Sequence, residues 1–215
     1  MARKSNWNDE YWLLLMQLYL RKPVGMKPLY SKEMVDLSLE LHISPTSLRQ
    51  RMAQIDTLQT PRIERFWQRY GNSPRRLGRA VSLLRSMKGY GNADEFYEGV
   101  EVQETFERDF RPVAEGTMIT PVMLVLILDL YFRLTPLTMA AETPEVQELS
   151  QLMGLSAGEV VEALQAFRHC DPYNSRRTAQ QGWLADACQQ TWNRFGNSDT
   201  EQLAALAAEL KEYFK

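Results

Sequence analysis

The stretch HISPTSLRQRM, residues 42–52, carries side chains that can form hydrogen bonds with the edges of nucleic-acid bases. If Leu48 points into a core, 100° steps along a helix bring Met52 and Ile55 to the same side. The same steps turn Ser47, Gln50, Ala53 and Gln54 outward and place Arg49 and Arg51 on the flanks. The residues predicted to contact bases are Ser47, Arg49, Gln50, Ala53 and Gln54. Arginine forks onto guanine, glutamine onto adenine, and a small residue lets a helix approach the groove floor. The pattern predicts the second helix of a helix-turn-helix that enters the major groove of DNA.

Arginines that could hold phosphates flank and follow this stretch. Cations at the start of a helix oppose the helix dipole, and a bound phosphate would remove that small cost. Each arginine alone is typical of a solvated surface, but the group indicates phosphate contact. The predicted phosphate-binding set is Arg51, Arg62, Arg65, Arg69, Arg75, Arg76 and Arg79. Arg51 lies beside the outward face. Residues 62, 65 and 69 share one face of a helix through spacings of three and four, and residues 75, 76 and 79 lie at the start of another helix.

Charge is distributed unevenly along the chain. Residues 1–90 contain 16 Lys+Arg and 7 Asp+Glu, a balance of +9, which leaves −11 for residues 91–215 of a chain with net charge −2. A basic half can bind a polyanion, because each neutralised phosphate releases condensed counterions. It can equally be attracted to the acidic half of its own chain. Composition leaves both interpretations open.

Residues suited to covalent or metal chemistry are scarce. The chain has 2 cysteines, Cys170 and Cys188, and 2 histidines, His42 and His169, too few for a zinc site or a disulfide framework. We expect His42 to be a turn residue. His169, Cys170 and Asp171 are adjacent but lack a further base or partner. We therefore expect no catalytic residue, no metal and no cofactor, and a protein that is not an enzyme.

Helical periodicity dominates the sequence and predicts an all-α fold. Apolar residues recur at helical spacing from about residue 8, from residue 31, after the turn at 42–44, around 66–70 and from residue 73. In the second half, Thr120-Pro121 and Thr143-Pro144 have the residue types of helix starts. The segment 88–119 is expected to be a connector with one short helix around residues 93–97. No alternating pattern predicts a sheet.

The longest apolar run does not suit a membrane protein. MLVLIL, residues 123–128, is far shorter than the roughly 20 residues of a membrane span. The charged start MARKSNWNDEYW does not resemble a secretory signal. We therefore expect a cytoplasmic protein without membrane contact.

The two halves of the chain share a pattern. Residues 13–21 match residues 125–133 at an offset of 112, and residues 31–56 match residues 143–168 at the same offset. FWQRYGN recurs as TWNRFGN at an offset of 125. We interpret this as a tandem duplication of one helix-turn-helix-like unit. The predicted organisation is a basic domain at 1–90, a connector at 91–118 and an acidic domain at 119–215. Residues in equivalent places are expected to be shared core: Tyr19, Trp67, Tyr131 and Trp192.

The second copy serves as an internal comparison for the first. The positions predicted to point outward on its third helix are Glu159, Val161, Glu162, Gln165 and Ala166. Two carboxylates without an arginine would be repelled by phosphates. We therefore expect only the basic copy to bind DNA, and the acidic copy to contact a protein partner or a second copy of the chain.

Several motifs of the second copy carry a family resemblance. They are LDLYFRLTP, TPEVQELSQLMGLSAGEVVEAL, Asp171-Pro172, Gly182-Trp183 and TWNRF, in this order. Together they resemble the helical N-terminal domain found ahead of HNH endonuclease domains in restriction-type enzymes. The resemblance covers residues 120–197 and, more loosely, residues 7–72, where Asp56 lacks the following proline. An HNH site needs clustered histidines, which this sequence does not contain, so the resemblance implies a DNA-associated module without the nuclease.

These observations together predict a DNA-binding accessory or regulatory protein, acting for example in transcription, that uses the helix-turn-helix of its basic copy on double-stranded DNA. The alternative is a non-enzymatic interaction or structural module whose helix-turn-helix-like faces dock on a partner or on a second copy.

Overall fold

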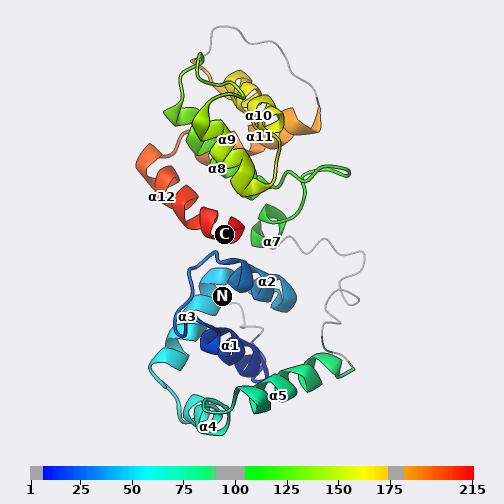
Figure 1. Cartoon of the computed structure of the whole chain (residues 1–215), viewed down its shortest axis with the longest axis vertical. Helices are drawn as coiled ribbons and strands as arrows, with labels where there is room; N and C mark the ends of the chain where they lie inside the picture. The colour runs from blue at the N-terminus through cyan, green and yellow to red at the C-terminus, as the bar shows by residue number, and fades with distance from the viewer. Residues whose placement is uncertain (1–6, 89, 91–104, 174–181) are drawn as a thin grey trace, which may run out of the picture. The chain divides into compact units, whose positions relative to one another are not determined.

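The structure is a computed structural model that describes residues 7–88, 90, 105–173 and 182–215 (Figure 1). All regular structure in these ranges is helical, which confirms the all-α prediction. The chain divides into two compact units, unit 1 (residues 1–103) and unit 2 (residues 104–215), and the division falls inside the predicted connector. The short helix predicted around residues 93–97 lies outside the described residues. Within the described ranges, no helix has the length and apolar character needed to span a bilayer.

Unit 1 contains five described helices arranged around the first of them. They are α1 (Tyr11–Leu20), α2 (Lys32–Leu41), α3 (Pro45–Asp56), α4 (Pro61–Tyr70) and α5 (Pro74–Ser86). Helix α1 contacts each of the other four. Its core side chains, such as Leu15, are fully buried together with Met34 of α2, Leu48 of α3 and Ile63 of α4. Burying such side chains from water stabilises each by about 1.5–3 kcal/mol, which holds α3 in a fixed orientation.

The turn between α2 and α3 is set by local chemistry. His42 ends α2 with a left-handed backbone, φ 53°, a conformation that is uncommon outside glycine. The amide of Ile43 then donates to the carbonyl of Ser38 at 3.1 Å. Ser44 caps the next helix by accepting from the amide of Ser47 at 3.4 Å, and Pro45 takes the first helical position. His42 is therefore a turn residue, as predicted.

Unit 2 packs its helices around α8 (Pro121–Arg133), which is buried over Val122–Tyr131. The others are α7 (Thr105–Asp109), α9 (Pro144–Met153), α10 (Ala157–Cys170), α11 (Trp183–Phe195), α12 (Thr200–Leu210) and the 3-10 turn η1 (Lys211–Phe214). Gly154 ends α9 with φ 70°, the position that His42 has in unit 1. Ser156 and Glu159 form a capping box at the start of α10.

Equivalent tyrosines of the two units form the same two contacts, one with an aspartate and one with a tryptophan. The Tyr19 hydroxyl donates to Asp56 at 2.6 Å, and the Tyr131 hydroxyl donates to Asp171 at 2.8 Å. The ring centroids of Tyr19 and Trp67 are 5.9 Å apart, and those of Tyr131 and Trp192 are also 5.9 Å apart. These four aromatic residues are therefore structural, as predicted. A common origin of the two units stays a prediction.

Candidate nucleic-acid interface

Helix α3 exposes most of the side chains that were predicted to contact bases. Leu48, Met52 and Ile55 are 0–1% exposed. The opposite side of the helix is open to solvent and carries Ser47, Arg49, Gln50 and Ala53, here called the α3 face. The hydroxyl of Ser47 accepts from Ser44 at 2.9 Å, so its own proton is available for a ligand. Asp56, the one carboxylate of α3, accepts the Tyr19 hydroxyl.

Arg51 and Gln54 differ from the prediction. Arg51 is half-buried, with its guanidinium carbon 5.2 Å from the ring centroid of Trp7 and 6.0 Å from that of Trp12. These distances allow cation–π contacts. Its Nη1 also lies 3.4 Å from the Oε1 of Gln54, a half-buried residue. Gln54 is therefore less exposed than the helical pattern predicted. Arg51, which the pattern placed on the flank of the helix, lies against two tryptophan rings.

Three of the predicted phosphate-binding arginines share one side of α4. Arg62, Arg65 and Arg69 line a hollow of about 280 Å³ together with Phe66, here called the α4 hollow. Arg62 forms an ion pair with Asp9 at 2.6 Å, and Arg65 donates from Nε to the carbonyl of Pro61 at 3.2 Å. The prediction that these arginines lie on one helix face is confirmed.

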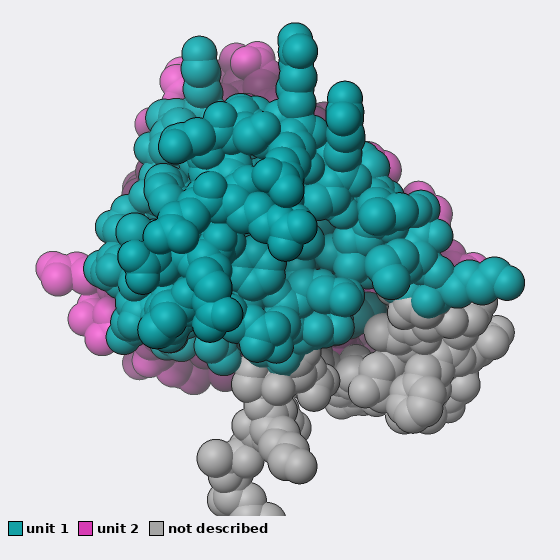
Figure 2. Space-filling model, turned by 90° about the horizontal axis from the view of Figure 1, so that it is seen from below, with its two compact units in different colours: residues 1–103 teal, residues 104–215 magenta. Residues whose placement is uncertain are grey.

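The remaining arginines of the set lie on α5. Arg75, Arg76 and Arg79 are exposed, and Arg76 lies 5.7 Å from the ring centroid of Tyr70. In the described structure, the side chain of Ser73 forms no capping hydrogen bond at this helix start. First-turn amide groups without a capping side chain favour a bound anion. Figure 2 shows a face of unit 1 from which several long side chains project into solvent.

Unit 2 presents different chemistry at the corresponding helix, α10. Glu162 and Gln165 are exposed, Val161 is half-buried, and hydrogen bonds from Ser156 lower the pKa of Glu159. The prediction for Ala166 was wrong: it is 1% exposed, because α10 packs against α8, α9 and α11 and is covered on more than one side. The outward positions that remain carry negative or neutral side chains.

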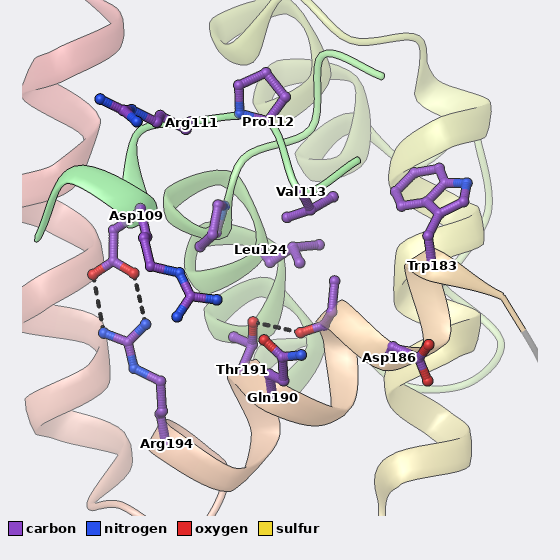
Figure 3. A pocket seen from close by; sticks show the side chains of 13 residues that line it. Asp109, Arg111, Pro112, Val113, Leu124, Trp183, Asp186, Gln190, Thr191 and Arg194 are labelled. Carbon is purple, nitrogen blue, oxygen red and sulfur yellow. Dashed lines mark hydrogen bonds and ion pairs between the residues drawn. The ribbon is translucent and has the colours of Figure 1, made fainter. Parts of the chain in front are cut away.

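Two ion-pair groups were not anticipated from the sequence. In unit 1, Arg85 holds both carboxylate oxygens of Glu40 at 2.7 Å, and the Tyr90 hydroxyl also donates to Glu40. In unit 2, Arg194 holds Asp109 at 2.6 and 3.0 Å. Figure 3 shows this pair beside a pocket of about 620 Å³. Each partner carboxylate is distant in sequence from its arginine. The only indication in the sequence was Arg194, which is repeated from Arg69 in the TWNRF motif.

Groups for covalent or metal chemistry do not gather in the described part of the chain. Among these residues, no three His, Cys, Asp or Glu side chains form a group that could hold a metal ion. Burial raises the pKa of both Cys170 and Cys188, which keeps the thiols protonated at neutral pH. The described thiols therefore have little nucleophilic character.

Comparisons with protein-family models, curated proteins and solved structures gave no match. The resemblance to the domain that precedes HNH endonucleases therefore stays a prediction.

Proposed function

We propose that unit 1 binds double-stranded DNA and that the protein acts as an accessory or regulatory factor. The observation that carries this proposal is the α3 face, where Ser47, Arg49, Gln50 and Ala53 are exposed above three fully buried apolar residues. A rigid helix with donors for base edges and a small residue at its centre suits the major groove. The nearest carboxylate on the same helix, Asp56, is engaged with Tyr19.

In this complex, α3 lies in the major groove and α2 crosses the backbone. The guanidinium of Arg49 donates to the O6 and N7 atoms of a guanine, and the amide of Gln50 pairs with an adenine. Arg65, Arg69, Arg75, Arg76 and Arg79 neutralise phosphates and fix the register of the helix. None of these five has a carboxylate partner among the described residues.

Unit 2 has another role in this proposal. Its α10 exposes Glu162 and Gln165 at the outward positions, so a phosphate-lined groove would repel it. We assign it to contact with a protein partner or with a second copy of the chain. Such an arrangement leaves the basic unit available to DNA and the acidic unit available for assembly.

Selection from a randomised duplex library, followed by anisotropy titration, tests the proposal. We expect an enriched site containing a guanine, and Arg49→Ala should relax the preference at one position and weaken binding by about 5- to 150-fold. Glu162→Gln on the exposed face of α10 is the control and should leave the base preference and the affinity unchanged. Absence of binding at about 100 μM and low salt would exclude DNA binding, because even non-specific binders reach that range.

The alternative function, a protein-interaction or structural module, predicts a different experimental result. A chain that dimerises at low salt, dissociates at high salt and ignores duplex DNA would have this second function. Sedimentation at several salt concentrations gives the oligomeric state directly.

A further inference from the structure

The α4 hollow combines positive charge with a half-buried aromatic ring that lines it. Among the described residues, three arginines and Phe66 line it, and this part of the lining contains no carboxylate. Phe66 is half-buried and packs against the core, so its position is fixed. Its ring lies nearly parallel to that of Tyr70, with centroids 6.3 Å apart and an angle of 23° between the planes. Arginine beside a fixed aromatic ring is the combination that binds unpaired nucleotides.

Each arginine of the hollow is oriented by a neighbour but retains free donors. Arg62 uses Nη2 on Asp9, Arg65 uses Nε on a backbone carbonyl, and Arg69 lies 5.6 Å from the Tyr70 ring centroid. A guanidinium has five N–H groups, so each can still donate to an anion. With the charge of Asp9 subtracted, the cluster keeps about two positive charges.

In unit 2, the equivalent helix face binds a carboxylate side chain. At the offset of 125, the four lining residues of the α4 hollow correspond to Ala187, Gln190, Thr191 and Arg194, which all line the pocket of Figure 3. There Arg194 holds the carboxylate of Asp109 through two hydrogen bonds, at 2.6 and 3.0 Å. The counterpart of Arg194 is Arg69. Each lies near the ring of the residue that follows it, Phe195 or Tyr70, but the described residues provide no carboxylate partner for Arg69. An arginine at this position is therefore suited to bind an oxyanion.

We propose that the α4 hollow holds one unstacked nucleotide of the bound strand, with its base on the ring of Phe66 and the adjoining phosphates on Arg65 and Arg69. This inference rests on the proposed function, since the nucleotide belongs to a DNA strand that unit 1 binds. The volume of about 280 Å³ lies near the lower limit of small-molecule sites, which is appropriate for a single base and not for a dinucleotide cofactor. The preferred ligand is then a duplex with an adjoining single strand.

The test uses the full chain and three labelled forms of one 20-base-pair duplex. One form is blunt, one has an overhang of four deoxyadenosines, and one has four abasic sugars with the same phosphates. Stacking of one base on an aromatic side chain is worth about 5- to 150-fold in affinity. We expect the adenine overhang to tighten the Kd by that factor relative to the abasic overhang. Equal affinities for the two overhangs would overturn the proposal.

Variants of Phe66 test whether its ring causes the higher affinity for the adenine overhang. Phe66→Leu keeps an apolar side chain against the core and removes the aromatic face, so the adenine overhang should fall to the affinity of the abasic one. Phe66→Tyr should retain the gain, and blunt-duplex binding should be unchanged in both variants. A gain that survives Phe66→Leu would contradict base stacking in the hollow.

A spectroscopic arm keeps the test independent of whether Phe66→Leu folds. The fluorescence of 2-aminopurine falls when the base stacks, so this base in the overhang should be quenched on binding of the unmodified chain. An unquenched signal in the bound state would overturn the proposal. Binding of poly-glutamate as tightly as the adenine overhang would do so too, and would identify a site for acidic peptides.

Failure of the proposed function would look different. The blunt duplex would then not bind or would not respond to Arg49→Ala, whereas a dA12 single strand would still bind through Phe66. The two inferences can therefore fail separately.

Discussion

The salt dependence of the proposed DNA binding can be calculated from the arginines of unit 1. Of the seven predicted to bind phosphate, Arg51 lies against Trp7 and Trp12, and Arg62 is paired with Asp9. The remaining five lie on α4 and α5: Arg65, Arg69, Arg75, Arg76 and Arg79. Each phosphate contact contributes about −0.9 to the slope of log K against log[salt]. Five contacts therefore give a slope of about −4.5.

The double variant Arg75→Gln/Arg76→Gln removes two of these contacts at the start of α5. Its slope should be about −2.7, and its affinity at 0.1 M salt should fall about 60-fold, the counterion-release contribution of two phosphates. Both side chains are exposed, so the fold should be unaffected. The measurement is fluorescence anisotropy with one duplex at four or more salt concentrations.

A control variant separates local contacts from net charge. Arg108→Gln/Lys215→Gln removes two positive charges from exposed positions of unit 2 and should leave the slope near −4.5. An unchanged slope in the α5 variant, or an equal decrease in both variants, would refute the assignment of Arg75 and Arg76 to phosphate.

The remaining predictions concern stability and use urea titrations. Gly196→Ala should lower the free energy of unfolding by about 1–3 kcal/mol, because an added Cβ would lie 2.6 Å from the Trp192 ring. Gly158→Ala, whose closest neighbour would be 3.8 Å away, should be neutral or stabilising, and an equal loss in both would contradict the steric argument. Tyr19→Phe removes the hydrogen bond to Asp56 and should cost about 1 kcal/mol at pH 7. That bond raises the pKa of Tyr19 to about 12, so the stabilisation is complete below pH 10 and is lost as the pH rises through 12. If the difference in the free energy of unfolding between wild type and Tyr19→Phe stays constant over this pH range, the linkage is disproved.

Helix starts could be predicted from sequence because their signals are local. Thr120 accepts the amide of Met123, and Pro121 is the first residue of α8, as the Thr-Pro pair indicated. The same holds for Pro144 at the start of α9. Helix α1 begins later than predicted, at Tyr11, because Asp9 and Glu10 form a turn in which the amide of Glu10 donates to the side chain of Asn8. Local side-chain competition with the backbone decided this boundary.

The surroundings of individual side chains could not be predicted, because they depend on segments distant in sequence. Helical geometry placed Arg51 on the flank of α3, but the tryptophans that hold it come from the N-terminal segment. Arg62 meets Asp9 for the same reason. Ala166 was assigned to solvent because a single periodicity assumes one buried face, whereas α10 has neighbours on more than one side.

Two arginines of unit 1, Arg62 and Arg65, stand at positions where the packing does not require a positive charge. Both units keep the Tyr–Trp and Tyr–Asp contacts, yet unit 2 has Ala187 and Gln190 where unit 1 has Arg62 and Arg65. Neutral residues at these positions are therefore compatible with the same packing. The first turn of α5 also contains two arginines and no acidic residue, which opposes the helix dipole at about 0.3–1 kcal/mol for each charge. A polyanion bound at Arg75 and Arg76 would offset this cost, which makes the start of α5 suited to a phosphate.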